Sequence, residues 1–467
     1  MIHDSIIRDR LVTGDKTASD VTRDIARPIL NNPSTAWKVG FTLSLIFLGI
    51  FGVSLLYTLF TGIGVWNINK SVMWGWDITN FVFWVGIGHA GTLISAVLLL
   101  FRQKWRMSIN RSAEAMTIFA VICAAMFPVF HMGRVWVGYW ALPLPNAFGS
   151  LWVNFNSPLL WDVFAISTYF SVSLLFWYIG LIPDIATIRD KVKSKLGKTM
   201  YGFFSMGWTG STRTWARYEL ISLILAGLST PLVLSVHTIV STDFATSVIP
   251  GWHTTIFPPY FVAGAVFAGF AMVLTFGLPL RSVYPQIKDF ITEKHLDWMA
   301  KILLATGLIV FYGYILEMFY GWYSGNTYEL ALVYNRLFGP YKWFYYALIF
   351  CNGIFPQLCW VPQLRRNVPF LFVLSIIVGI GMWLERFVII PMSLTRDFLT
   401  SSWGYYAPTE WDWALFIGTM GFFVFLLFMF IKVLPIINIF EMRDLLMKNH
   451  HQFGHGHDGH EKSEEAH

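Results

Sequence analysis

Residues 78–101 have the sequence ITNFVFWVGIGHAGTLISAVLLLF, in which no position is Asp, Glu, Lys or Arg. A helix needs about 20 apolar residues to cross the hydrocarbon of a bilayer. This stretch is long enough, and its one ionisable side chain is His89. It predicts a membrane-spanning helix.

The rest of the chain repeats this pattern. Of the 467 residues, 55% are hydrophobic and only 13% are charged, a balance that is unusual for soluble domains. We expect an all-α polytopic membrane protein with ten spans. The predicted spans are residues 36–60, 78–101, 115–140, 159–182, 217–240, 259–280, 298–321, 342–361, 368–391 and 411–434.

The positions of Lys and Arg predict the orientation of these spans. The two tails and the loops after spans two, four, six and eight hold 27 of the 33 basic residues. The opposite loops hold Lys70, Arg336, Lys342 and Arg396. Basic loops stay on the cytoplasmic side, so both termini are predicted to be cytoplasmic. The net positive charge therefore reflects topology and anionic lipid, and it does not indicate nucleic-acid binding.

An internal repeat predicts how the spans are grouped. Gly75-Trp76-Asp77 before span two recurs as Gly251-Trp252-His253 before span six, 176 residues later. An even number of spans separates the two copies, so we expect two four-helix bundles of the same sense, spans two to five and six to nine. The predicted parts are a polar cytoplasmic tail 1–35, peripheral span 36–60, bundles 61–240 and 241–391, outer loop and peripheral span 392–434, and a His-rich cytoplasmic tail 435–467. The polar tail also argues against a cleavable signal peptide.

Ionisable residues inside the spans gather at the outer, non-cytoplasmic edge. Charge in hydrocarbon is costly, so such a cluster predicts a reaction site or an ion path. His89 lies nearer the middle of the membrane. The outer cluster comprises His131, Arg134, Asp162, His237, Asp243, Glu317, Glu385 and Arg386.

Structural explanations remain open for the members of this cluster. Asp162 and Asp243 also fit helix ends in contact with water, and His237 fits an interfacial histidine. Arg134 fits a structural ion pair with the adjacent Glu385 and Arg386. The functional interpretation rests on the coincidence of five helices at one face, whereas the inner halves of those helices are almost uncharged.

Familiar cofactor motifs are weak in this chain. Residues 86–91 match GxGxxG, but they lie inside an apolar helix without a preceding strand, so we expect close helix packing there instead of dinucleotide binding. Cys123, Cys351 and Cys359 lack the spacing of an iron–sulfur site. Three membrane histidines, one each on spans two, three and five, do not form the repeated pairs of a bis-histidine cytochrome, so we expect no intrinsic haem. We assign no metal to the His-rich tail, which contains His450, His451, His455, His457 and His460.

Quinol oxidation suits such a membrane protein. The reaction releases two protons with two electrons, so its site needs acceptors such as Asp or His with a path outward, and apolar walls for the ring and tail. The electrons must pass to a metal centre. In this interpretation a partner protein holds that centre, and the short Trp- and Tyr-rich outer loops form its docking surface.

Three runs of residues resemble one family. They are residues 76–96, the motif His131-Met132-Gly133-Arg134 and the run Asn156-Ser157-Pro158-Leu159-Leu160-Trp161-Asp162. Together they are similar to the membrane subunits of polysulfide reductase, the NrfD-like family, and above all to the larger such subunit of bacterial alternative complex III. The resemblance extends from the first span to the last. It implies two four-helix bundles flanked by extra helices, with a quinol site, for which menaquinol is expected, near the outer face.

The resemblance also implies partners and residue roles. Expected partners are a periplasmic iron–sulfur subunit, multi-haem and mono-haem c-type cytochromes, a second NrfD-like membrane subunit and a terminal oxidase, in the bacterial inner membrane. His131, Asp162 and Asp243 would act on the quinol, supported by His89, Arg134, Glu385 and Arg386. Glu317 and His237 would belong to a proton route. Glu114, Asp184, Glu219 and Asp297 lie near inner span ends, but the middle of the spans looks too apolar for a continuous path.

Two other functions remain open on the sequence alone. A secondary transporter would place its site at mid-membrane between broken helices, and Pro128 and Pro356 could mark such breaks. A structural anchor for a peripheral redox complex would explain the aromatic outer loops. It would not explain the buried acids.

Overall fold

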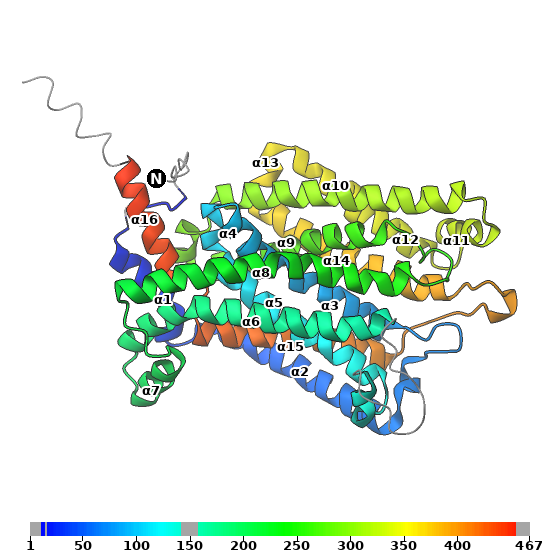
Figure 1. The fold of residues 1–467 in the computed structure, drawn as a ribbon, viewed down its shortest axis with the longest axis horizontal. Coiled ribbons are helices and arrows are strands. Elements are labelled where there is room, and N and C mark those ends of the chain that lie inside the picture. The colour runs from blue at the N-terminus through cyan, green and yellow to red at the C-terminus, as the bar shows by residue number, and fades with distance from the viewer. Residues whose placement is uncertain (1–10, 15, 142–156, 454–467) are drawn as a thin grey trace, which may run out of the picture.

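The computed structural model describes residues 11–14, 16–141 and 157–453, and this part of the chain is helical without β-strands (Figure 1). Nine of its helices are long and apolar enough to span a membrane. They are α2 (Thr35–Thr61), α3 with its continuation (Trp76–Leu100), α5 (Asn110–His131), α6 (Pro158–Lys191), α8 (Thr212–Ala245), α9 (Phe257–Val283), α10 (Glu293–Tyr323), α14 with its continuation (Val368–Met392) and α15 (Glu410–Val433). These elements confirm the predicted all-α polytopic class.

The predicted span 342–361 is helical but irregular. It consists of α12 (Lys342–Leu348), the π-helical η6 (Ile349–Ile354) and the 3-10 helix η7 (Phe355–Trp360). Pro356 lies in the first turn of η7 and has no backbone N–H to donate, so one helical hydrogen bond is missing at this point. In contrast, α5 continues past Pro128 for three residues. Two further π-helical turns, η2 (Leu93–Val97) and η8 (Val388–Met392), lie within the spans that begin with α3 and α14.

Shorter elements mark the two ends of the helix assembly (Figure 1). We call the end with α1, α7 and α16 the terminal face, and the end with α11 the far face. The short elements are α1 (Ala18–Leu30), η1 (Ile63–Trp66), α4 (Leu98–Leu100), η3 (Lys104–Ser108), η4 (Val135–Ala141), α7 (Lys195–Phe204), η5 (Pro285–Asp289), α11 (Thr327–Phe338), α13 (Pro362–Arg365), η9 (Thr400–Ser402) and α16 (Ile439–Phe453). The first and last described helices, α1 and α16, therefore lie at the same face. This requires an even number of spans between them, which the nine long helices and the irregular span 342–361 together provide.

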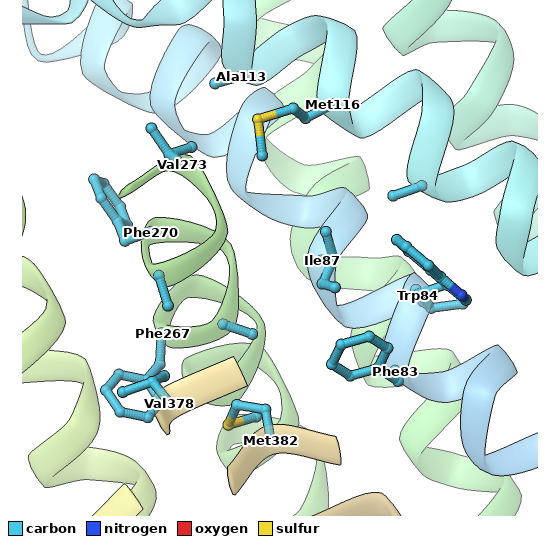
Figure 2. Close-up of a cluster of buried hydrophobic side chains, with 14 of the residues drawn as sticks. Phe83, Trp84, Ile87, Ala113, Met116, Phe267, Phe270, Val273, Val378 and Met382 are labelled. Atoms are coloured by element: carbon cyan, nitrogen blue, oxygen red, sulfur yellow. The ribbon is translucent and has the colours of Figure 1, made fainter. Parts of the chain in front are cut away.

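The long helices pack in two groups that meet along α3 and α9. In the first group α3 packs on α5, and α6 packs on α8. In the second, α9 packs on α10 and α14, and α14 also contacts α12. Phe83 and Trp84 of α3, Phe267 of α9 and Met382 of α14 lie in the apolar interior of the helix assembly (Figure 2). The first and last spans, α2 and α15, pack on each other at the side of this assembly.

A glycine sets the spacing of the closest pair, α3 and α5. A Cβ atom on Gly91 would lie 1.9 Å from the Ala113 carbonyl oxygen and 2.2 Å from Thr117 Oγ1. Only a residue without a side chain allows this approach. Gly91 of the GxGxxG run therefore serves helix packing, as the sequence predicts.

Span three ends nearer the membrane interior than predicted, at His131 instead of residue 140. Gly133 takes φ +72°, the left-handed conformation that ends helices, and its N–H donates to the Phe130 carbonyl at 2.9 Å. Arg134 consequently lies beyond the helix end and is exposed, which corrects its placement inside a span.

Candidate functional site

The first polar pair at the far face joins α3 to α5. Asp77, in the first turn of α3, is fully buried, and its Oδ2 is hydrogen-bonded to Nδ1 of His131, the last residue of α5. An acid at a helix start and a histidine at a helix end both suit the helix dipoles. About 22% of the His131 side chain is exposed. The imidazole can therefore contact a ligand while Asp77 orients it from behind.

The second pair joins α6 to α8 at the same end of the first group. Asp162 lies near the start of α6 and Asp243 near the end of α8, and their carboxyl groups lie next to each other. Asp162 is buried. Two carboxylates in contact repel each other unless they share a proton. The pair can thus accept or release a proton at a fixed position.

A third polar cluster lies in the second group. Glu385 and Arg386 form a buried ion pair on α14, and the Tyr314 hydroxyl of α10 donates to Glu385. Asn352 donates to the Tyr314 hydroxyl at 2.8 Å. The Arg386 guanidinium lies 4.5 Å from the centre of the Phe261 ring. Glu385 is thus paired with Arg386, whereas the exposed Arg134 belongs to the turn after α5.

Glu317 has a cation partner that lies in an outer loop of the predicted topology. Arg336 of α11 is buried and lies 2.8 Å from the Glu317 carboxylate. Helix α11 places this guanidinium against α10, on which Glu317 lies. The far face therefore buries a complete ion pair here.

His237 lies deeper than predicted. It precedes the end of α8 at Ala245 by eight residues, about 12 Å at 1.5 Å per residue. Its ring centre is 3.6 Å from that of His89, and both residues are buried. His237 is therefore paired with the mid-membrane histidine and not with the outer acids, because α8 continues two further turns beyond it.

Hydroxyl groups extend the polar path from His89 toward the terminal face. Tyr169 stacks on His89 with ring centres 5.0 Å apart, and its hydroxyl is 2.9 Å from Thr92 Oγ1. Ser95, one turn later within η2, donates its hydroxyl to the Gly91 carbonyl at 2.8 Å. The interior of the first group is thus more polar than its lack of charge suggests. Hydroxyl side chains scarcely alter the hydropathy of a span, which is why the middle looks too apolar in the sequence.

Acids near the terminal face have structural partners. Arg111 contacts Glu114 at 3.2 Å and Asp184 at 3.5 Å, and Asp184 also accepts from the first two backbone N–H groups of α16. Asp297 pairs with Arg365 at 2.8 Å. Glu219 is exposed. These contacts fasten α16 and α13 to the long helices.

Metal ligands do not cluster in the described part of the chain, where no three His, Cys, Asp or Glu side chains come together. Cys123, Cys351 and Cys359 are buried and unpaired with one another. Of the tail histidines, His450 and His451 fall on α16 without described side chains, and His455, His457 and His460 lie outside the described residues.

Asp77 is the site residue that sequence reasoning missed. The predicted span begins at residue 78, so Asp77 counts as a loop residue in the sequence although it directly follows the repeated Gly-Trp pair. Two features of the sequence could have identified Asp77. It is an acid at the outer edge of a span, and it lies within residues 76–96, which resemble the family.

Comparison with known proteins agrees with this architecture. The family described as "Polysulphide reductase, NrfD" matches residues 64–396. A Halobacterium salinarum protein named as a membrane subunit of dimethyl sulfoxide reductase is 21% identical over 437 residues, covering 88% of this chain and 94% of that relative. Since the family match covers well over half of the chain, this protein belongs to the polysulphide reductase NrfD family of membrane subunits of redox enzyme complexes.

Proposed function

We propose that this chain is the quinol-oxidising membrane subunit of a respiratory quinol:electron acceptor oxidoreductase of the alternative complex III type. The observation that carries the proposal is the far end of the first group, where α3 and α5 hold one proton-accepting pair and α6 and α8 hold another. The family membership makes a redox complex the setting.

The two pairs match the two protons of a quinol. His131, backed by Asp77, accepts the proton of one hydroxyl as its electron leaves, and the Asp162–Asp243 pair accepts the other. A positioned base of this kind accelerates proton transfer about 10²- to 10⁴-fold. Glu385 and Arg386 support the site from the second group by fixing Tyr314 and Asn352.

The electrons pass to partners at the far face. Exposed aromatic side chains gather on its loops and helix ends, including Trp136, Trp322, Trp403 and Tyr405. Such side chains anchor protein interfaces and the membrane boundary. We assign this face to a periplasmic iron–sulfur subunit that delivers electrons to c-type cytochromes. A second NrfD-like subunit and a terminal oxidase would complete the assembly in the bacterial inner membrane, with menaquinol as the donor.

A proton route is the second part of the proposal. Glu317 with Arg336 and His237 with His89 supply further polar groups for this route, and Tyr169 and Thr92 continue from His89 toward the terminal face. His237→Leu should lower the number of protons moved per electron in proteoliposomes while quinol oxidation continues. An unchanged ratio would remove His237 from the route.

The decisive experiment measures quinol-dependent cytochrome reduction by the purified complex. We expect His131→Gln and Asp162→Asn to reduce turnover at least about 100-fold, because each removes a proton acceptor, while the complex still assembles. His253→Gln and Asp397→Asn are matched controls on exposed positions of the far face. Full turnover in both site variants would refute the assignment.

The same preparation separates the alternatives. A secondary transporter would carry a solute into liposomes without electron transfer, and a structural anchor would lose no turnover in any of these variants. The outer position of the two proton-accepting pairs and the same-sense grouping of the helices favour quinol oxidation over transport.

A further inference from the structure

A groove of about 400 Å³ lies on the terminal-face half of the helix assembly, away from the proton-accepting pairs. Its lining residues come from the flanking pair α2 and α15 on one side and from α5, α9 and α14 on the other. Its wall includes Trp37, Met116, Phe276, Gly277, Phe372 and Phe428. All of these residues lie in the halves of their helices nearest the terminal face, so the groove and the proposed quinol site belong to opposite leaflets.

Three of the four polar side chains of the groove wall already donate to backbone carbonyls, and the fourth is Tyr284 at the end of α9. Trp37 Nε1 donates to the Phe428 carbonyl at 3.1 Å, Ser112 Oγ donates to the Ile109 carbonyl at 2.9 Å, and Thr275 Oγ1 donates to the Ala271 carbonyl at 3.0 Å. A quinone ring needs donors for its carbonyl oxygens, and these groups have none to spare. The wall suits a hydrocarbon chain.

The rim of the groove opens on the lipid-facing side of the helices. Ala36, Pro279 and Val283 are exposed at the rim, and α2 continues from it with the exposed Val39 and Leu43. In a membrane protein such a surface contacts lipid chains. The groove is therefore filled from the bilayer.

The charge beside the rim favours an anionic headgroup. Lys38 follows Trp37, and Lys288 lies four residues after Tyr284; both lysines are exposed. The nearby acid Asp289 is engaged by Lys16 at 2.8 Å. Lysines at a membrane surface attract anionic lipids.

We propose that this groove is a specific site for one acyl chain of an anionic phospholipid from the leaflet at the terminal face, with the headgroup beside Lys38 and Lys288. The proposal does not depend on quinol oxidation. It assigns the groove to lipid that holds the α2–α15 pair against the remaining spans.

The test is photo-crosslinking of the purified complex with phosphatidylglycerol that carries a diazirine in one acyl chain. We expect labelled peptides from residues 36–37, 273–284 and 424–436. No atom lies within 4 Å of a Cβ built on Gly277, so Gly277→Leu places its side chain in the groove and should reduce this labelling at least about fivefold. Gly227→Leu is the matched control, since its Cβ on α8 is equally unobstructed but lies outside the groove.

A second groove variant, a second lipid and a lysine double variant complete the test. Val424→Phe fills the groove from α15 and should give the same loss if Gly277→Leu fails to assemble. Phosphatidylcholine with the same diazirine chain should label less, and Lys38→Gln with Lys288→Gln should abolish that difference. Labelling that both groove variants leave unchanged, equal labelling by the two lipids, or displacement by a quinone analogue would overturn the proposal. Each readout is independent of turnover.

Discussion

At the scale of residues, the two members of the first far-face pair differ in accessibility and therefore in their roles. His131 is partly exposed, whereas Asp77 behind it has no exposed surface. A base that is oriented by a buried carboxylate holds one ring nitrogen toward its substrate. Asp77 is thus a positioning residue, and its removal should change how His131 works without removing the base.

Asp77→Asn tests this division of roles. We expect quinol turnover to fall at least about tenfold, and the pH profile of turnover to change, because the imidazole loses its counter-charge and its fixed tautomer. Asp397→Asn serves as the exposed control. A lower yield of complex with an unaltered pH profile in the assembled fraction would indicate a purely structural Asp77.

The buried Glu385–Arg386 pair predicts a stability effect. Removing one member of a buried ion pair leaves an uncompensated charge and costs about 3–5 kcal/mol. Arg386→Met should therefore lower the melting temperature of the detergent-solubilised protein by several degrees, and adding Glu385→Gln should recover part of the loss. Arg23→Gln is the control, because the Arg23 side chain is 70% exposed where it pairs with Asp20, and it should leave the melting temperature nearly unchanged. A wild-type melting temperature for Arg386→Met would contradict the prediction.

At the scale of elements, the spacing of α3 and α5 determines the geometry of the first pair. Gly91 allows these helices to approach, and the same helices carry Asp77 and His131. A side chain at this position meets a backbone carbonyl, which cannot rotate away. The helices themselves must separate.

Gly91→Val should consequently destabilise the protein by more than the about 1–3 kcal/mol typical of overpacking and should lower turnover as well. Gly49→Val on α2, where a Cβ meets no atom within 4 Å, is the matched control. Thermal melting and quinol-dependent reduction measure the two effects. If neither the melting temperature nor the turnover falls, then α3 and α5 adjust to the valine without disturbing the Asp77–His131 pair.

At the scale of the whole molecule, the terminal face is expected to be cytoplasmic and the far face periplasmic. The three native cysteines are buried, so introduced cysteines can be labelled against a low background. A membrane-impermeant maleimide should label Ser401→Cys on intact cells but Lys193→Cys only after permeabilisation, since both positions are exposed on opposite faces. The reverse pattern would place the proton-accepting pairs on the cytoplasmic side and refute the proposed orientation.

The sequence by itself determined the helical class and the approximate ends of most spans, because the hydrocarbon of a bilayer admits long apolar helices. It also drew attention to Asp162, Asp243 and His131. Only the tertiary structure decided which side chains meet. Asp77 faces His131, His237 faces His89, and Arg336 reaches Glu317 from a loop helix. These contacts depend on the rotation of each helix about its axis and on the residue at which it ends. A turn such as the one at Gly133 changes the helix end, and a π-helical segment changes the rotation, and neither change alters the hydropathy of a span.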